Sequence, residues 1–223
     1  MSRTVHIVGN GDSAVLYNEA PRKGLKLTCN LPPFAVQGAY ATCIVDFKMM
    51  HTIHTKIIDV PGEWILGARP KMYMEKNPGF YTQRARQIKQ FYTKLPKYAA
   101  NYTDLNCGHM AAYFALENLK ADTLHLYGFD SIFDFNLRSS TDFYITSDRG
   151  SMNNNRLTNN WRPLWNNMFK EFKDTQIHLH HFHNLLKFET PENVNIFNYS
   201  KRGEIIDAGN SSGSLAERPI VEK

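Results

Sequence analysis

The chain begins with residues suited to holding a phosphate group. Residues 5–8 form a short run typical of a β-strand, and this run leads into Gly-Asn-Gly at 9–11, with Ser13 two residues later. Glycines at a strand exit let the backbone approach a ligand, and N–H groups exposed in such a loop favour an anion. The dinucleotide fingerprint G-x-G-x-x-G is incomplete, because Ala14 occupies its third glycine position. A tight turn without a ligand is the alternative.

Polar residues also follow other predicted strands. Asn30 comes directly after residues 25–29, Asp46 lies near the end of a third predicted strand, and Asp130 stands in the Gly-Phe-Asp-Ser segment after a later strand. Ligands of parallel sheets bind outside the carboxyl ends of the strands, so we expect these side chains to meet the glycine loop there. Asp46 is placed to bind a ribose hydroxyl. Capping of a turn is the alternative role of Asp130.

Histidines are concentrated near residue 180. Two-residue spacing places His178 and His180 on one face of a strand and His181 and His183 on the other. Strand-spaced histidine pairs can bind zinc. No cysteine or carboxylate cluster of recognisable spacing completes such a site, so metal binding is the less favoured reading. At the end of the strand, His181 or His183 could act as an acid or contact a phosphate.

These side chains need a framework that alternates strands and helices. Strands are predicted at residues 5–8, 25–29, 42–47, 56–60, 123–127 and 176–180, the last being the final strand, and helices at 82–98, 110–119 and 161–172. This alternation predicts an α/β protein with a mostly parallel sheet. The spacing of Trp161, Trp165 and Phe169 predicts a core stripe on the last helix, with a stacking surface for sugars or bases as the alternative. Residues 134–160 are polar and predict a lid or acceptor loop.

The composition is that of a globular protein, because 42% of the 223 residues are hydrophobic. Cys29, Cys43 and Cys107 have no metal-like spacing, which favours a reduced, cytoplasmic setting. No apolar run reaches the roughly 20 residues of a membrane span, and a strand so close to Met1 leaves no space for a signal peptide. We expect one domain over residues 1–203 and a flexible tail over 204–223.

The net charge of +5 is compatible with an acidic ligand or a nucleic acid. The densest basic stretch comprises Arg84, Arg86, Lys89, Lys94 and Lys97. We interpret it as the solvated face of a helix, with a patch that binds a polyanion as the alternative.

Three motifs together resemble the bacterial sialyltransferases and their wider fold superfamily. They are the strand followed by Gly-Asn-Gly-x-Ser, the Cys29-Asn30 pair, and the order glycine, helix, strand and Gly-Phe-Asp near residue 130. The similarity covers roughly residues 4–48 and 104–185. It implies a Rossmann-like three-layer α/β/α sandwich and transfer of a sugar from a nucleotide-sugar donor without a metal or other cofactor. The chain contains no Asp-x-Asp motif to hold a divalent ion, which agrees with this expectation.

The resemblance also implies a donor-binding set. By position, the donor would be held by Gly9, Asn10, Gly11, Ser13 and Asn30, and its base or phosphate by Asn106, Cys107 and Gly108. His109, at the start of the predicted helix, could point toward an anion, with packing as the alternative. For Cys107, a small residue that lets a ligand approach is favoured over a nucleophile, because no paired histidine motif supports the latter.

The catalytic half of the resemblance is incomplete. The general-base histidine of the family lies in a loop that corresponds to about residues 147–156, and this stretch contains no histidine. Asp148 and, less directly, Asp142 remain there. Asp148 is the candidate base, beside Asp130 and His183 elsewhere.

The expected function is therefore metal-independent transfer of a sugar to an acceptor hydroxyl, either on a glycan or on a hydroxylated base in DNA. Proteins resembling the pterin pyrophosphokinases share the glycine loop, and they imply ATP- and Mg²⁺-dependent transfer of diphosphate as an alternative. A nucleotide-binding protein of the same fold without turnover is the third reading.

Overall fold

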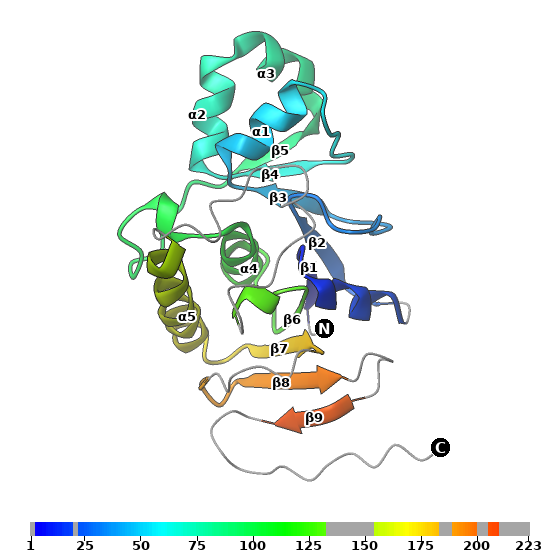
Figure 1. Cartoon of the computed structure of the whole chain (residues 1–223), viewed down its shortest axis with the longest axis vertical. Helices are drawn as coiled ribbons and strands as arrows, with labels where there is room; N and C mark the ends of the chain where they lie inside the picture. The colour runs from blue at the N-terminus through cyan, green and yellow to red at the C-terminus, as the bar shows by residue number, and fades with distance from the viewer. Residues whose placement is uncertain (1–2, 20–21, 133–153, 183–188, 200–204, 210–223) are drawn as a thin grey trace.

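The computed structural model describes residues 3–19, 22–132, 154–182, 189–199 and 205–209, with the backbone alone for 154–160 and 205–209. Nine strands form one sheet in the order β5-β4-β3-β2-β1-β6-β7-β8-β9 (Figure 1). All neighbouring pairs are parallel except β8 and β9. The strands are β1 (Thr4–Val8), β2 (Leu25–Cys29), β3 (Ala41–Ile44), β4 (Trp64–Leu66), β5 (Ile88–Phe91), β6 (Thr123–Tyr127), β7 (Gln176–His181), β8 (Val194–Tyr199) and β9 (Ile205–Gly209).

The sheet is buried on both faces near its centre, as parallel sheets require. Ile7 of β1 belongs to the main core cluster together with the helix α4 (Cys107–Glu117), whereas the next residue, Val8, packs with the 3-10 helix η1 (Asp12–Glu19). Successive residues of a strand point to opposite faces, so α4 and η1 cover opposite sides of the sheet. The chain thus has an α/β, Rossmann-like fold.

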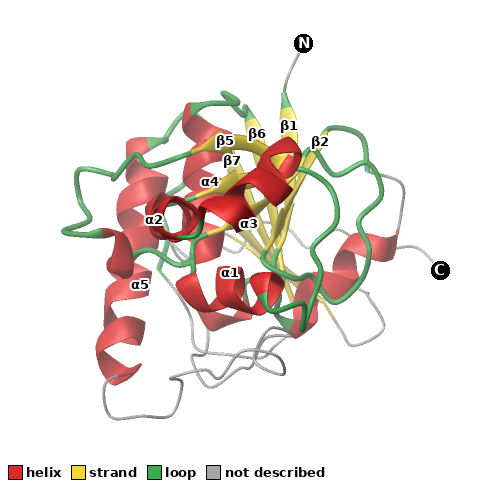
Figure 2. Cartoon of the chain, turned by 90° about the horizontal axis from the view of Figure 1, so that it is seen from above, coloured by secondary structure: helices red, strands yellow, loops and turns green. Residues whose placement is uncertain are grey.

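The other helices extend these two layers. α5 (Asn154–Glu171) lies on the same side as α4 (Figure 2), where its buried Trp165 and Phe169 join the main core. α1 (Phe47–His54), α2 (Ala68–Lys76) and α3 (Pro78–Arg84) enclose a second core cluster over β3 and β4. Trp161 packs against the main core as well, which confirms the predicted core stripe.

Several predicted elements are confirmed. β2 and β6 have the predicted bounds, and β1 and β7 differ from them by one residue at one end. The helix predicted at 110–119 is α4, which begins three residues earlier because Asn106 caps it, its Oδ1 accepting from the His109 N–H at 2.8 Å.

Between residues 42 and 98 one predicted strand is confirmed with a different end, and two predicted elements were wrong. The strand predicted at 42–47 is β3, which ends at Ile44, and Asp46 is the N-cap of α1 rather than a strand residue. Residues 56–60 form no strand. The fourth strand is β4, which has only three residues and is too short to show an alternating pattern in the sequence. The helix expected over 82–98 ends at Arg84 and is followed by β5.

The basic stretch in this region is consequently not one helix face. Arg84 pairs with Asp59 at 3.1 Å, Lys89 pairs with Glu63 at 2.5 Å, and Lys94 pairs with Glu117. Three of its five charges therefore have acidic partners, which weakens the case for a polyanion-binding patch.

The sheet also extends further than expected toward the C-terminus. β7 is not the final strand, because β8 pairs with it and β9 pairs with β8 in the antiparallel direction. β9 falls within the segment predicted as a flexible tail from residue 204, and its backbone forms a ladder with β8. Residues 210–223 lie outside the described part of the chain.

His109 is a core residue of α4. Its side chain is 1% exposed, its Nε2 lies 2.8 Å from the Tyr98 hydroxyl, and its ring packs edge-on against Trp165. Burial lowers the pKa of His109 from its ordinary 6.5 to about 3. The packing alternative for this residue is therefore the one that its surroundings support.

We predict that His109 makes the fold sensitive to mild acid. Below pH 6.5 the unfolded chain binds a proton that the folded His109 excludes, so the free energy of unfolding must fall as the pH falls. Between pH 7.5 and 5.0 this residue alone should remove about 2 kcal/mol, at roughly 1.36 kcal/mol per pH unit below its unfolded pKa. Denaturant unfolding of the wild type and of His109→Gln at both pH values measures the difference.

The variant should lose about 2 kcal/mol less than the wild type over this interval, whatever its stability at pH 7.5. His54, exposed on α1, provides the control, because His54→Gln should retain the wild-type dependence. An equal fall in His109→Gln and in the wild type would contradict the prediction.

Candidate functional site

The strand order reverses at β1, which has β2 on one side and β6 on the other. In open α/β sheets, this reversal places a crevice at the carboxyl ends of the two strands where the order changes. The chain segments that leave β1 and β6 there are residues 9–13 and 128–131. The structure thus brings together the two glycine-containing segments that the sequence singled out, although they lie about 120 residues apart.

The two segments bond to each other through their backbones. The Gly9 N–H donates to the Tyr127 carbonyl at 2.7 Å, and the Gly11 N–H donates to the Gly128 carbonyl at 3.0 Å. A Cβ on Gly9 would lie 2.6 Å from the Gly128 oxygen, and one on Gly11 would lie 2.2 Å from Asp130 Oδ2. These glycines are needed for close approach, but what approaches them is the 128–130 segment of the same chain and not a ligand. Their N–H groups already have acceptors and are not the donors expected to cradle a phosphate.

The buried side chain of Asp130 stabilises this contact between residues 9–13 and 128–131. It is 1% exposed, and its two carboxylate oxygens accept from Ser13, one from the backbone N–H at 2.9 Å and the other from the hydroxyl. The Ser13 hydroxyl oxygen in turn accepts from the Phe182 N–H at 3.3 Å, which connects the end of β7 to the same point. Ser13 and Asp130 therefore join the exits of three strands. Their burial supports a positioning role rather than direct contact with substrate.

Asn10 and Asn30 hold the next strand exit against the first. The Asn10 amide donates to the carbonyl of Leu31, directly after Asn30. Asn30 has a left-handed backbone, with φ of 49°, and its N–H donates to the Cys43 carbonyl at 2.9 Å. Asn30 is 9% exposed, and its Oδ1 is buried without a hydrogen-bond partner among the residues that the structure describes. A buried acceptor of this kind is uncommon in a folded protein and indicates a missing partner.

A charged pair lies at the exits of β3 and β4. Arg69, in the first turn of α2, donates from Nη2 to Asp46 Oδ1 at 2.7 Å. Burial raises the pKa of Asp46, and Arg69 opposes this rise. The structure thus places Asp46 at the expected edge. Sequence reasoning missed Arg69 because the three-residue strand before it gives no visible alternation.

The N-terminus of α4 completes this edge. The Cys107 thiol donates to the same Cys43 carbonyl as Asn30, at 2.8 Å, which places the helix start beside the β2 exit. Cys107 is 6% exposed, and burial raises the pKa of its thiol, so it has no nucleophilic character. A Cβ on Gly108 would lie 2.4 Å from the Phe129 ring, so this glycine serves packing. Asn106 caps the helix, as described above.

Three predicted residues lie outside the described part of the chain, namely Asp142, Asp148 and His183. The structure therefore places neither the candidate base Asp148 nor His183 relative to the strand exits. His181, the other histidine proposed there, is 4% exposed at the end of β7.

Comparison with known proteins adds no assignment: no family model matches the chain, and searches of curated proteins and of solved structures found no match. Among the helices of the described residues, none combines the length and the apolar character that crossing a membrane requires.

We predict that Asp130→Asn destabilises the fold by about 1–3 kcal/mol. The substitution replaces one of the two acceptor oxygens by an amide donor, which then faces a donor of Ser13 in a buried site. Denaturant unfolding at pH 7.5 measures the change. Asp174→Asn is the matched control, because Asp174 is exposed and should tolerate the substitution within about 0.5 kcal/mol. Equal stability of Asp130→Asn and the wild type would refute the positioning role.

Proposed function

We propose that the edge formed by the exits of β1, β2, β3 and β4 binds the nucleotide of a nucleotide sugar, and that the chain transfers the sugar to an acceptor hydroxyl without a metal. The observation that carries the proposal is the unpartnered, buried Oδ1 of Asn30. A donor group of a ligand, either a ribose hydroxyl or a base N–H, would supply the partner that the described residues do not.

The side chain and the backbone of Asn30 each carry an energetic cost in the folded chain. A buried acceptor without a partner costs about 1–3 kcal/mol. The left-handed backbone adds a further cost for any residue with a Cβ, although asparagine tolerates it better than most. Such costs concentrate at ligand sites, where binding recovers them. Glycine would relieve the backbone cost, so the presence of asparagine favours a role for its side chain.

Arg69 and Asp46 supply the remaining chemistry that a nucleotide needs. A guanidinium has five N–H donors, more than one carboxylate can use, and its geometry suits the oxygens of a diphosphate. The carboxylate of Asp46 is an acceptor for ribose hydroxyls, the role that the sequence analysis assigned to it. The pair holds both groups at the edge before a ligand arrives, because each restrains the other at 2.7 Å.

The transfer step requires a base that takes the proton from the acceptor hydroxyl while the sugar leaves the nucleotide phosphate. Asp130 does not fit this role, because it is buried and both of its oxygens accept from Ser13. Asp148 and His183 remain the candidate bases. Asp130 acts indirectly, by holding the strand exits on which the donor would lie.

A nucleotide-binding protein without turnover is the second candidate. The observation that favours it is the same engagement of Asp130, which removes one of the three candidate bases. Nucleotide binding is common to both functions, and release of free nucleotide in the presence of an acceptor distinguishes them.

We predict that Asn30→Gly abolishes nucleotide binding while preserving the fold. Glycine accepts the φ of 49° without strain and removes only the side chain that would contact the ligand. The wild type should be stabilised by about 2.7 kcal/mol by a nucleotide at 100 times its dissociation constant. A thermal-shift panel of CMP, UDP, GDP, ADP and ATP, each with and without Mg²⁺, measures this stabilisation, and Asn30→Gly should lose it.

Lys120→Gly is the matched control. Lys120 has a φ of 52° and is exposed after α4, before β6 begins, so this variant makes the same backbone change at the opposite edge of the sheet. It should respond to nucleotide as the wild type does. A shift with CMP, UDP or GDP that is independent of Mg²⁺ supports the sugar transferase, whereas a shift with ATP and Mg²⁺ alone supports diphosphate transfer. Full retention of binding by Asn30→Gly would contradict the proposed site.

A further inference from the structure

A second group of side chains lies on the middle of the sheet, away from the strand exits. In the parallel register, His6 of β1 is opposite His125 of β6, and His125 is opposite His178 of β7. One row further on, Tyr127 is opposite His180, which is opposite Phe197 of β8. These residues alternate with the main-core residues Leu124, Leu126, Ile177 and Leu179, so they occupy the other face, the one that η1 contacts.

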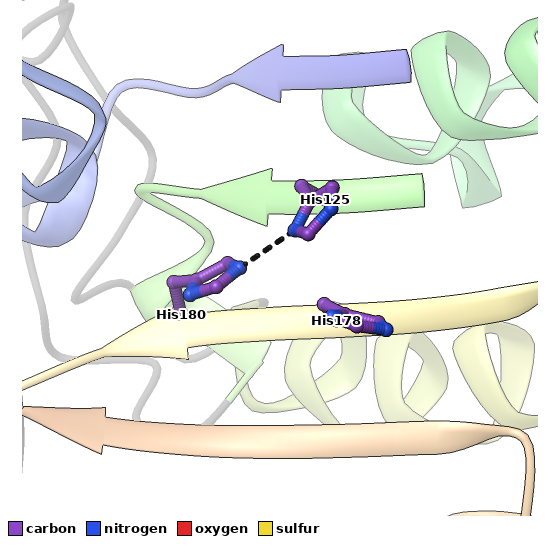
Figure 3. Close-up of side chains that lie close together, drawn as sticks. All are labelled: His125, His178 and His180. Atoms are coloured by element: carbon purple, nitrogen blue, oxygen red, sulfur yellow. Dashed lines mark hydrogen bonds between the residues drawn. The ribbon is translucent and has the colours of Figure 1, made fainter. Parts of the chain in front are cut away.

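Three of these histidines converge on one point. His125, His178 and His180 each offer a ring nitrogen, and the three nitrogens lie within 4.8 Å of one another (Figure 3). His125 Nδ1 and His180 Nε2 are 3.0 Å apart. Zinc bound tetrahedrally by imidazole at about 2.0–2.1 Å needs nitrogens roughly 3.3–3.4 Å apart. Small rotations of the rings are therefore sufficient to surround an ion.

The outer nitrogen of His180 already has a partner. His180 Nδ1 lies 2.9 Å from the hydroxyl of Tyr199, at the end of β8. When this Nδ1–H donates to the tyrosine oxygen, the lone pair is on Nε2, which is the nitrogen that faces His125. Metal-bound histidines characteristically have such a partner on their second nitrogen, because it fixes the tautomer and the orientation of the ring.

The three histidines are also in the protonation state that a metal requires. Burial, followed by the charges of neighbouring side chains, lowers the pKa of His125 to about 3 and that of His180 to about 2, and burial lowers the pKa of His178. Neutral imidazoles therefore face one another at physiological pH. Arg22, whose guanidinium lies over the Tyr127 ring at 5.5 Å, is the nearby positive charge that works against a cation here.

We propose that His125, His178 and His180 bind one Zn²⁺ ion, with water in the fourth position. Imidazole is a preferred zinc ligand, and three histidines with an open position are an established zinc donor set. The opposing charge of Arg22 favours hydroxide over water as the fourth ligand, since an anion reduces the net charge of the site. The ion would connect β6 to β7. The proposal uses none of the residues assigned to the nucleotide and leaves the transfer step independent of metal.

The experiment uses the full chain without an affinity tag of histidines, stripped of metal with a chelator. Zinc chloride is titrated in competition with a chromophoric chelator, which reports both stoichiometry and affinity. We expect one equivalent of Zn²⁺ per chain with a dissociation constant in the micromolar range or below. Co²⁺ in place of Zn²⁺ should give the intense visible absorption of a four- or five-coordinate ion. Zn²⁺ should raise the melting temperature, and a chelator should reverse the increase.

The variants locate the ion. His178→Gln and His180→Gln should each weaken Zn²⁺ binding by at least 100-fold, and Tyr199→Phe should weaken it by about 10–100-fold through the loss of the second-nitrogen contact. His54→Gln is the matched control for adventitious binding to an exposed histidine and should bind as the wild type does. Tyr199→Phe keeps all three ligands and most of the packing, so it remains informative where a histidine variant does not fold.

Two results overturn the proposal. One is a wild-type chain that binds no Zn²⁺ and gives no Co²⁺ spectrum, which would make the histidines an aromatic packing layer alone. The other is binding that survives in His178→Gln and His180→Gln or is lost in His54→Gln, which would place the ion elsewhere.

Discussion

The contact between the exits of β1 and β6 is the constraint on which the candidate site depends. Parallel strands that diverge to different crossovers have no covalent link between their ends. Here hydrogen bonds between Ser13 and Asp130, in the buried interior, hold these ends together. The backbone hydrogen bonds of Gly9 and Gly11 join the same two strand exits next to this pair. Because Phe182 bonds to the same serine, the end of β7 has the same anchor. The edge where a ligand is expected is thus built on one buried carboxylate.

In this arrangement the glycines of residues 9–11 have a different role from the one that the sequence suggested. Gly-Asn-Gly after a strand is compatible with a phosphate cradle and with a tight contact between two segments of the same chain, since both need a backbone without Cβ atoms. The structure assigns Gly9 and Gly11 to the second use, because carbonyls of residues 127 and 128 take their N–H groups. The polar side chains between and beyond them, Asn10 and Asn30, then become the better indicators of a ligand.

Sequence reasoning was most reliable where one strand or helix buries a complete periodic pattern. The α/β class, β2, β6 and α4 belong to this group, because their apolar residues face a core formed by neighbours on either side. It failed over residues 45–98, where β4 has three residues and α1 to α3 are at most nine residues long. Elements this short are specified by tertiary packing in the second core cluster rather than by their own periodicity. Arg69 was missed for the same reason, whereas Asn30 was found because it follows a well-patterned strand.

The histidines illustrate a limit of a different kind. Spacing alone placed His178 and His180 on one face of a strand. The lack of a nearby cysteine or carboxylate cluster, together with the resemblance to metal-independent transferases, led to the expectation of no metal. The third histidine of this cluster is His125, more than fifty residues earlier and on the neighbouring strand, so only the register of β6 against β7 reveals it. A parallel sheet connects residues through crossovers of arbitrary length, and ligand sets that lie across strands therefore have no signature in linear spacing. The same topology that collects loop residues at the strand exits also collects face residues at the strand centres, so one sheet can offer two chemically separate sites.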